Sequence, residues 1–374
     1  MIWLLLFGAL FLLVLAAGFY LVRGVHRLRF VAALSRGHGA AAWGISALTV
    51  LLPIALFWVT LGYMNAILIP LHLAVFWAIA DLLQWLVQKV RKRPGRRTLA
   101  AAAALAVTIV YLAVGWVQAF HVWQTDYMIA TEKRVGHLRV ALLADAHVGT
   151  TFDGDGLTRH LDRLQAQQPD VVVVAGNFVD EDTTEENMRA ACRALGKLRA
   201  PYGVYFVFGN HDKGNYSNGR RGYGGDDLIA ELSRNGVTVL QDEAVPLGDH
   251  FSLIGRQDAS EVLDFGGTRA AMGELAAGAD PERFVIVLDH QPRDYTAEAA
   301  AGVDLVLSGH THGGQMIPLP QLIRWFHLGD DRVYGTERRG NTSFIVTSGI
   351  SDWAIKFKTG CRSEYVIVDI EGRE

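Results

Sequence analysis

Cysteine is nearly absent from this sequence of 374 residues, which contains only Cys192 and Cys361. Two cysteines exclude a framework of several disulfides and a zinc module built from cysteine ligands. Acidic residues are almost missing from residues 1–123, which contain one, Asp81, and ten Lys and Arg. The remainder lacks a basic excess, with 37 Asp and Glu against 25 Lys and Arg. Because a nucleic-acid-binding domain needs a basic footprint, we expect no nucleic-acid partner.

The first third is dominated by four long apolar stretches, at residues 2–22, 42–64, 66–87 and 99–120. Each has about the 20 residues that a helix needs to cross a bilayer. The first stretch lacks a basic n-region and a clear cleavage site, which favours a retained span over a signal peptide. We therefore predict a transmembrane region of about four helices at residues 1–122, in contact with lipid, and a second domain at residues 123–374.

Basic residues predict the orientation of these spans. They occur in the segments after the first and third stretches, and the link near Asn65 has none; they are Arg23, Arg27, Arg29, Arg36, Lys89, Arg91, Lys92, Arg93, Arg96 and Arg97. The positive-inside rule places both segments in the cytoplasm, and the second domain outside a bacterial inner or plasma membrane. Asp81 lies inside the third stretch. An acid there often marks function, but its distance from Lys89 favours simple pairing at the interface.

The second part alternates short apolar runs with amphipathic segments. The runs at 138–144, 171–175, 204–208, 284–288 and 305–307 have the composition and length of buried strands. Helical patterns separate them at 156–168, 184–199, 226–234 and 294–301, and further strands are expected at 237–240, 251–254, 343–347 and 365–370. This alternation predicts an α/β domain with a largely parallel, covered sheet. About 17 residues between the fourth stretch and the first strand are expected to form a tether.

Polar residues follow directly after the predicted strands. These positions hold Asp145, His147, Asn177, Asn210, His211, His290, His310 and His312, and therefore five of the thirteen His. Ligands in α/β sheets bind beyond the carboxyl ends of strands. Imidazoles and carboxylates are costly to bury unless they are paired or bind a metal. Oxygen and imidazole ligands without thiolate suit Mn²⁺, Zn²⁺ or iron, so we predict a metal site.

At these residues the sequence resembles the calcineurin-like metallophosphoesterase superfamily, in its membrane-anchored bacterial branch. The shared motifs are Asp145-Ala-His147, Gly176-Asn177-Phe-Val-Asp180, Gly209-Asn210-His211-Asp212, His290 and Gly309-His310-Thr-His312-Gly-Gly-Gln315. The resemblance extends from about His137 to the end of the chain. It implies a two-sheet β-sandwich flanked by helices, two divalent metal ions and hydrolysis of a phosphomonoester, phosphodiester or pyrophosphate.

The resemblance also implies a role for each motif residue. Asp145, His147 and His312 match the ligands of one metal, and Asn210, His290 and His310 match those of the second. Position 177 is the place of a carboxylate that bridges both metals. His211 matches the residue that protonates the leaving oxygen, and Asp180 matches the acid that orients it.

Asn177 departs from the family pattern, because an amide carries no charge and bridges two cations poorly. Three explanations stay open: an introduced inactivating substitution, a natural residue with reduced or altered activity, or a natural pseudoenzyme that acts as a sensor or scaffold.

Arg220 and Arg221 are candidates for binding a substrate phosphate, with a solvated surface pair as the alternative. The apolar stretches favour a phosphorylated, lipid-linked substrate, and the oligomeric state cannot be predicted from these patterns. A transporter with an accessory domain is disfavoured by the few polar residues in the spans.

Overall fold

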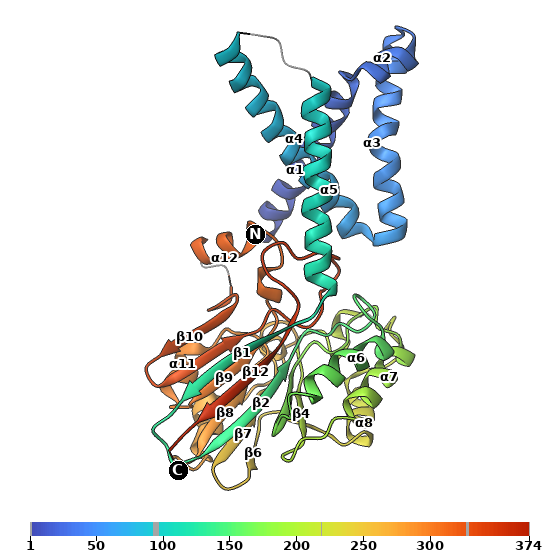
Figure 1. Cartoon of the computed structure of the whole chain (residues 1–374). Helices are drawn as coiled ribbons and strands as arrows, with labels where there is room; N and C mark the ends of the chain where they lie inside the picture. Colours follow the sequence, from blue (N-terminus) through green and yellow to red (C-terminus); the bar gives the residue numbers. More distant parts are fainter. Residues whose placement is uncertain (1, 93–96, 218, 327–328, 374) are drawn as a thin grey trace. The chain divides into compact units, whose positions relative to one another are not determined.

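The chain divides into two units in a computed structural model that describes residues 2–92, 97–217, 219–326 and 329–373 (Figure 1). The helical unit comprises Met1–Gly115, and the α/β unit comprises Trp116–Glu374. The sequence-based boundary between residues 122 and 123 remains a prediction about domain organisation. We describe each unit by itself.

The helical unit consists of apolar helices joined by short turns. Its helices are α1 (Ile2–His26), α2 (Arg29–Ser35), α3 (Gly39–Leu61), α4 (Tyr63–Arg91) and α5 (Arg97–Phe120), the last of which extends into the α/β unit. Among the described residues, three helices are long and apolar enough to span a bilayer: α3, α4 and the Thr98–Phe120 part of α5. A fourth span is obtained if residues Leu10–His26 of α1 count together with α2 as one segment bent by 72°. The expected apolar helical region is therefore present, with three to four candidate spans.

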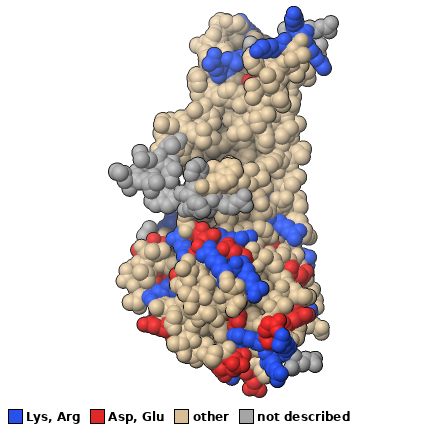
Figure 2. All heavy atoms as spheres, turned by 90° about the vertical axis from the view of Figure 1, so that its left-hand side faces the viewer, with Lys and Arg blue, Asp and Glu red and all other residues tan. Residues whose placement is uncertain are grey.

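Both predicted basic segments belong to one end of the helical unit, because α1 and α4 end there and α3 and α5 begin there (Figure 1). Figure 2 shows Lys and Arg atoms gathered at this end on the visible face. Exposed apolar side chains, such as Leu52, Trp58 and Val110, cover the helices. Arg93 and Arg96 lie outside the described residues. The arrangement suits helices that are surrounded by lipid, with charged ends in water.

The α/β unit contains two sheets of six strands each. The first has the order β1-β12-β2-β3-β4-β5, with β1 (Trp123–Ala130), β2 (His137–Leu143), β3 (Val171–Ala175), β4 (Val204–Val207), β5 (Val237–Val239) and β12 (Glu364–Glu371). The second has the order β10-β11-β9-β8-β7-β6, with β6 (Glu243–Leu247), β7 (Phe251–Gly255), β8 (Phe284–Leu288), β9 (Leu305–Ser308), β10 (Gly335–Arg339) and β11 (Thr342–Val346). Strands β2–β5 are parallel, as are β7, β8, β9 and β11, and β6 and β10 pair antiparallel at the two edges of the second sheet.

Alternating side chains of the strands build separate cores on the two faces of each sheet. Val173 of β3 packs with Ile286 of β8 in the core between the sheets. Val172 points to the outer face, which is covered by α6 (Gly154–Gln165), α7 (Glu185–Leu195) and α8 (Gly225–Arg234). The outer face of the second sheet packs against α10 (Met272–Ala277) and α11 (Tyr295–Ala300). The result is the expected two-sheet sandwich flanked by helices.

Short elements complete the α/β unit: η1 (Asn215–Ser217), α9 (Ser260–Leu263), η2 (His312–Gly314) and α12 (Leu319–Phe326). Strand β1 was not predicted. It occupies about half of the segment expected to be a tether and pairs in parallel with β12, from Trp123↔Glu364 to Ala130↔Glu371. Only His121 and Val122 separate α5 from β1. The expectation of a 17-residue tether is therefore wrong, because main-chain pairing incorporates this segment into the first sheet.

Candidate metal centre

The polar residues that follow the strands converge in the α/β unit. Asp145 and His147 follow β2, Asn177 follows β3, Asn210 and His211 follow β4, His290 follows β8, and His310 and His312 follow β9. Five of these residues have left-handed backbone conformations: Asp145 (φ 55°), His147 (φ 37°), Asn177 (φ 51°), His310 (φ 72°) and His312 (φ 48°). Such conformations are unfavourable for residues with a Cβ and cluster at functional sites.

Asp145, His147 and His312 form one compact group of buried ligand atoms. One atom from each side chain lies within 4.8 Å of the others. His147 Nε2 is 4.0 Å and His312 Nε2 is 3.8 Å from Asp145 Oδ1. Asp145 Oδ1 and His147 Nε2 are buried and have no hydrogen-bond partner among the described residues. Buried polar atoms normally have a partner, so this donor set fits a divalent cation.

The second nitrogen of each imidazole in this group already has a contact. His147 Nδ1 lies 3.2 Å from Asp180 Oδ2, and His312 Nδ1 lies 3.3 Å from the Ser351 carbonyl oxygen. These contacts place the proton on Nδ1 and leave Nε2 as a lone pair, which is the arrangement of a metal-binding histidine. Although burial opposes it, the hydrogen bond with His147 lowers the pKa of Asp180 to about 2.

Asn210, His290 and His310 form a second group around one oxygen atom. Asn210 Oδ1 lies 3.2 Å from His290 Nε2 and 3.2 Å from His310 Nδ1. His290 Nδ1 donates to the Ala175 carbonyl oxygen at 2.7 Å. A neutral His290 therefore directs a lone pair at the lone pairs of Asn210 Oδ1. A cation bound by both atoms resolves this unfavourable contact, so the second group also fits a metal ion.

Burial favours the ligating form of two histidines. It lowers the pKa of His310 well below the usual range, with a further contribution from His290. It likewise lowers the pKa of His312, with a further contribution from His147. Neutral imidazole is the form that binds metal. Both side chains are therefore in the required form at neutral pH.

Asn177 lies beside the second group. Its Nδ2 donates to Asn210 Oδ1 at 3.1 Å, and its Oδ1 accepts from the His211 backbone N–H at 3.1 Å. Asp212, which belongs to a quoted motif but was given no role in the sequence analysis, fixes this part of the chain. Its buried carboxylate accepts from four backbone N–H groups, those of Asn177, Phe178, Val179 and Gly209, at 2.7–3.0 Å. One side chain thereby holds the loops after β3 and β4 together.

The acid beside His211 differs from the predicted one. His211 Nδ1 lies 2.6 Å from Glu181 Oε1, whereas Asp180 contacts His147. Asp180 and Glu181 are neighbours in the sequence, but their side chains reach different histidines. The pairing lowers the pKa of Glu181, against the opposing effect of burial. The prediction that Asp180 orients His211 is therefore wrong, because Glu181 contacts His211 instead. The only sequence signal for Glu181 was its place in an acidic run.

The two candidate phosphate-binding arginines have different environments. Arg221 is buried, and its guanidinium donates to main-chain oxygens of Asp180 and Asp212 at 3.3 and 2.7 Å. It also lies 4.0 Å from the ring centroid of Tyr223. Arg221 thus holds loops together rather than forming half of a solvated surface pair. Arg220 is exposed and donates to the Ser217 carbonyl oxygen at 3.2 Å.

Two aromatic rings near His211 were not predicted to belong to the site. The ring centroid of Tyr216 lies 5.3 Å from that of His211, and the centroid of Trp353 lies 5.5 Å from it. They come from the segment after Asp212 and from the segment before β12. Neither residue belongs to one of the sequence motifs, so only the fold reveals that they lie near the site.

Comparison with known proteins agrees with this geometry. Residues 138–314 match the family model of the calcineurin-like phosphoesterases. An uncharacterized metallophosphoesterase of Campylobacter jejuni is 27% identical over 240 residues, which cover 63% of this chain and 60% of that protein. A transmembrane protein with a metallophosphoesterase domain from Danio rerio is 31% identical over 283 residues, covering 72% of this chain and 61% of that protein.

A shorter relative, an uncharacterized metallophosphoesterase of Aquifex aeolicus, is 29% identical over 252 residues, covering 66% of this chain and 91% of that protein. The chain spans about 60% of the length of the first two relatives. The match begins at Leu138, in β2, and ends at Gly314, just after the last of the candidate metal-binding histidines.

Proposed function

Because residues 138–314 form a calcineurin-like phosphoesterase domain, we propose that this protein is a metal-dependent phosphohydrolase. The observation that carries the proposal is a pair of ligand groups, the buried Asp145–His147–His312 and the partly buried Asn210–His290–His310. In the first group Asp145 Oδ1 and His147 Nε2 lack a partner among the described residues, and in the second group lone pairs face one another. Each group would hold one divalent ion, and imidazole ligands favour Mn²⁺, Zn²⁺ or iron over Mg²⁺. When bound, two such ions supply Lewis-acid polarisation of a phosphoryl group and activation of the attacking water.

His211 is the proposed proton donor. Its Nδ1 is held by Glu181 at 2.6 Å, so its Nε2 is available to protonate the oxygen that leaves phosphorus. The contact with the Glu181 carboxylate fixes the orientation of the ring. General acid catalysis of this kind contributes about 10²–10⁴-fold. Asp180 instead orients the ligand His147, and Asp212 fixes the backbone that carries Asn177.

Asn177 contacts the second group through Asn210, and the proposed bridging position would then hold an amide without a negative charge. The expected consequence is weaker binding of at least one ion and lower turnover than a carboxylate would give. The surrounding ligands and the His211–Glu181 pair are all in place, which supports an enzyme of reduced activity over a scaffold that has lost its chemistry.

The substrate class and location follow from the helical unit. Three to four candidate spans and basic residues at one end support a membrane protein whose α/β unit lies outside the cytoplasm. Only His121 and Val122 separate α5 from β1 in the chain, and this short connection favours a substrate that is itself held in the membrane. We therefore propose a lipid-linked phosphomonoester, phosphodiester or pyrophosphate as the substrate.

The activity is tested with the full-length chain in detergent micelles. Bound transition metals are measured after purification and after addition of Mn²⁺, and hydrolysis is followed with an aryl phosphodiester and an aryl phosphomonoester. The substitution Asp145→Asn should reduce metal content and abolish turnover, whereas His250→Ala, at an exposed position of the same unit, should change neither. Absence of bound metal in the unmodified protein, or turnover that survives both a chelator and Asp145→Asn, would contradict the proposal.

A further inference from the structure

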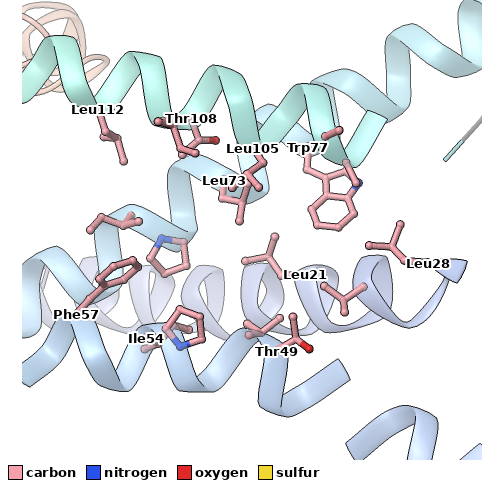
Figure 3. A pocket seen from close by; sticks show the side chains of 18 of the residues that line it. Leu21, Leu28, Thr49, Ile54, Phe57, Leu73, Trp77, Leu105, Thr108 and Leu112 are labelled. Atoms are coloured by element: carbon pink, nitrogen blue, oxygen red, sulfur yellow. The ribbon is translucent and has the colours of Figure 1, made fainter. Parts of the chain in front are cut away.

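An apolar cavity of about 670 Å³ lies among the helices of the helical unit (Figure 3). Its walls come from α1, α3, α4 and α5, with Leu21, Ile54, Leu73 and Leu105 as examples. The volume lies within the range of roughly 300–1,000 Å³ that is typical of small-molecule sites. The cavity is therefore large enough for a ligand of lipid or drug size.

Two of the few polar side chains that line this cavity are satisfied within their own helices. The hydroxyl of Thr49 donates to the Ile45 carbonyl oxygen at 2.8 Å, and that of Thr108 donates to the Ala104 carbonyl oxygen at 2.7 Å. Both hydrogen bonds lie within the helix of the threonine concerned. The chemistry of the cavity is thus that of hydrocarbon, and its matching ligand is an apolar chain.

A second, polar pocket of about 260 Å³ adjoins the cavity. The two share Leu28 and Trp77 as lining residues, so their walls are continuous. The polar pocket is also lined by Arg27, Asp81 and the amides of Gln84 and Gln88. An apolar cavity that continues into a pocket with charges and amides matches a ligand with a hydrocarbon part and a polar head.

One face of α4 connects the two compartments. Leu73 and Trp77 line the apolar cavity, and Asp81, Gln84 and Gln88 line the polar pocket. Their spacing of three or four residues places them on the same side of the helix. The stripe changes from apolar to polar toward the end of α4 that carries Lys89, which is where a headgroup would lie.

The polar pocket contains one positive and one negative side chain. Arg27 supplies a guanidinium, which suits a phosphate group. Asp81 supplies a carboxylate, whose Oδ2 accepts from the Tyr20 hydroxyl at 2.9 Å. No described side chain forms a hydrogen bond or ion pair with the other carboxylate oxygen, which suits it to a cation. Ionisable residues within spans are rare and mark binding or transport sites, and here the pair matches a headgroup with both charges.

We infer that the helical unit binds a glycerophospholipid whose headgroup carries a phosphate and a primary amine, with its acyl chains in the apolar cavity, its phosphate at Arg27 and its ammonium at Asp81. This site lies wholly within residues 21–112, and it does not depend on the metal centre or on the proposed phosphohydrolase activity.

The test uses the full-length chain, exchanged into mixed micelles with equal amounts of phosphatidylethanolamine, phosphatidylcholine and phosphatidylglycerol. Lipid retained after purification is measured by native mass spectrometry. We expect about one phosphatidylethanolamine per chain, retained at least fivefold over the other two. Equal retention of the three lipids, a preference for phosphatidylglycerol, or no retained lipid would overturn the inference.

Two substitutions separate the chain site from the headgroup site. Leu73→Trp should fill the cavity and reduce retained lipid at least fivefold, whereas Leu83→Trp, on an exposed face of the same helix, should not. Asp81→Asn keeps an acceptor for Tyr20 and should remove the preference for the amine without reducing total phospholipid to zero. Helix content by circular dichroism verifies that the variants fold. If the Leu73 and Leu83 variants retain equal amounts of lipid, or if Asp81→Asn keeps the amine preference, the inference fails.

Discussion

Replacing Asn177 by Asp should have opposite effects on the metal-free and the metal-loaded protein. The change substitutes an oxygen for Nδ2, which donates to Asn210 Oδ1 at 3.1 Å. The contact from the His211 backbone N–H to Oδ1, at 3.1 Å, is kept. Asn177→Asp therefore removes one partly buried hydrogen bond and brings two oxygens face to face unless a cation lies between them.

The size of both effects follows from that contact. Without metal, a buried group left without its partner costs about 1–3 kcal/mol, which for a unit of this size lowers the melting temperature by about 2–4 °C per kcal/mol. With metal, a negatively charged oxygen should strengthen binding at least about tenfold, the low end for changes even one step removed from the ion. Turnover should rise by a similar factor.

The assay is thermal unfolding of the full-length chain, in chelator and in excess Mn²⁺, for Asn177→Asp, the unmodified protein and Asn341→Asp. Asn341 is exposed, so its substitution adds the same charge without touching the site. The stabilisation by Mn²⁺ should be larger in Asn177→Asp than in the other two, and its unfolding temperature in chelator should be lower. Equal metal affinity and equal turnover on an aryl phosphodiester would refute a bridging position for residue 177.

Three further outcomes are expected. His211→Ala should leave metal content unchanged and lower turnover of the Asn177→Asp protein by about 10²–10⁴-fold. Glu181→Gln should give a smaller loss of turnover with an altered pH profile, whereas His290→Ala should lose metal. Equal metal loss in the His211 and His290 variants would make His211 a ligand. Burial lowers the pKa of His160 to about 4. Between about pH 6.5 and 4, this imidazole is therefore protonated in the unfolded chain but neutral in the folded chain. The free energy of unfolding should therefore fall by about 1–2 kcal/mol between pH 7 and 5, and His160→Asn should lack this part of the fall in denaturant titrations at the two pH values. A reporter that works only outside the cytoplasm, fused after the last residue, should be active, and protease should reach the α/β unit in intact spheroplasts; protection of the unit there would reverse the proposed orientation.

Buried strands were the most predictable part of the fold. The predicted runs 171–175 and 284–288 coincide with β3 (Val171–Ala175) and β8 (Phe284–Leu288). Both strands are covered on two faces, so every side chain is apolar and the signal is continuous. The edge strands β6 and β10 were missed. Their side chains are largely exposed or half-buried, and main-chain pairing, which leaves little trace in the sequence, holds them in place.

The site was predictable in its residues but not in its contacts. The residues after the strands lie near one another in the structure, because parallel strands deliver their ends to one edge of a sheet, and their roles as ligands stay a prediction. The pairing of acids with histidines depends on side-chain direction, which left-handed backbone conformations at Asp145 and His147 change abruptly. Asp180 reaches His147 and its neighbour Glu181 reaches His211, a distinction that spacing alone does not contain.

In the helical unit, the sequence predicts the helices better than it predicts the contacts between them. Hydropathy predicts its spans well, because length and apolarity are sufficient for a helix in lipid. It says little about which faces meet, since a face toward lipid and a face toward another helix are equally apolar. The exception is the face of α4 that carries Asp81, Gln84 and Gln88, where polar residues recur every three or four positions. Because polar side chains are costly in hydrocarbon, such a stripe needs a partner, and in this unit it lines the pocket that continues from the apolar cavity.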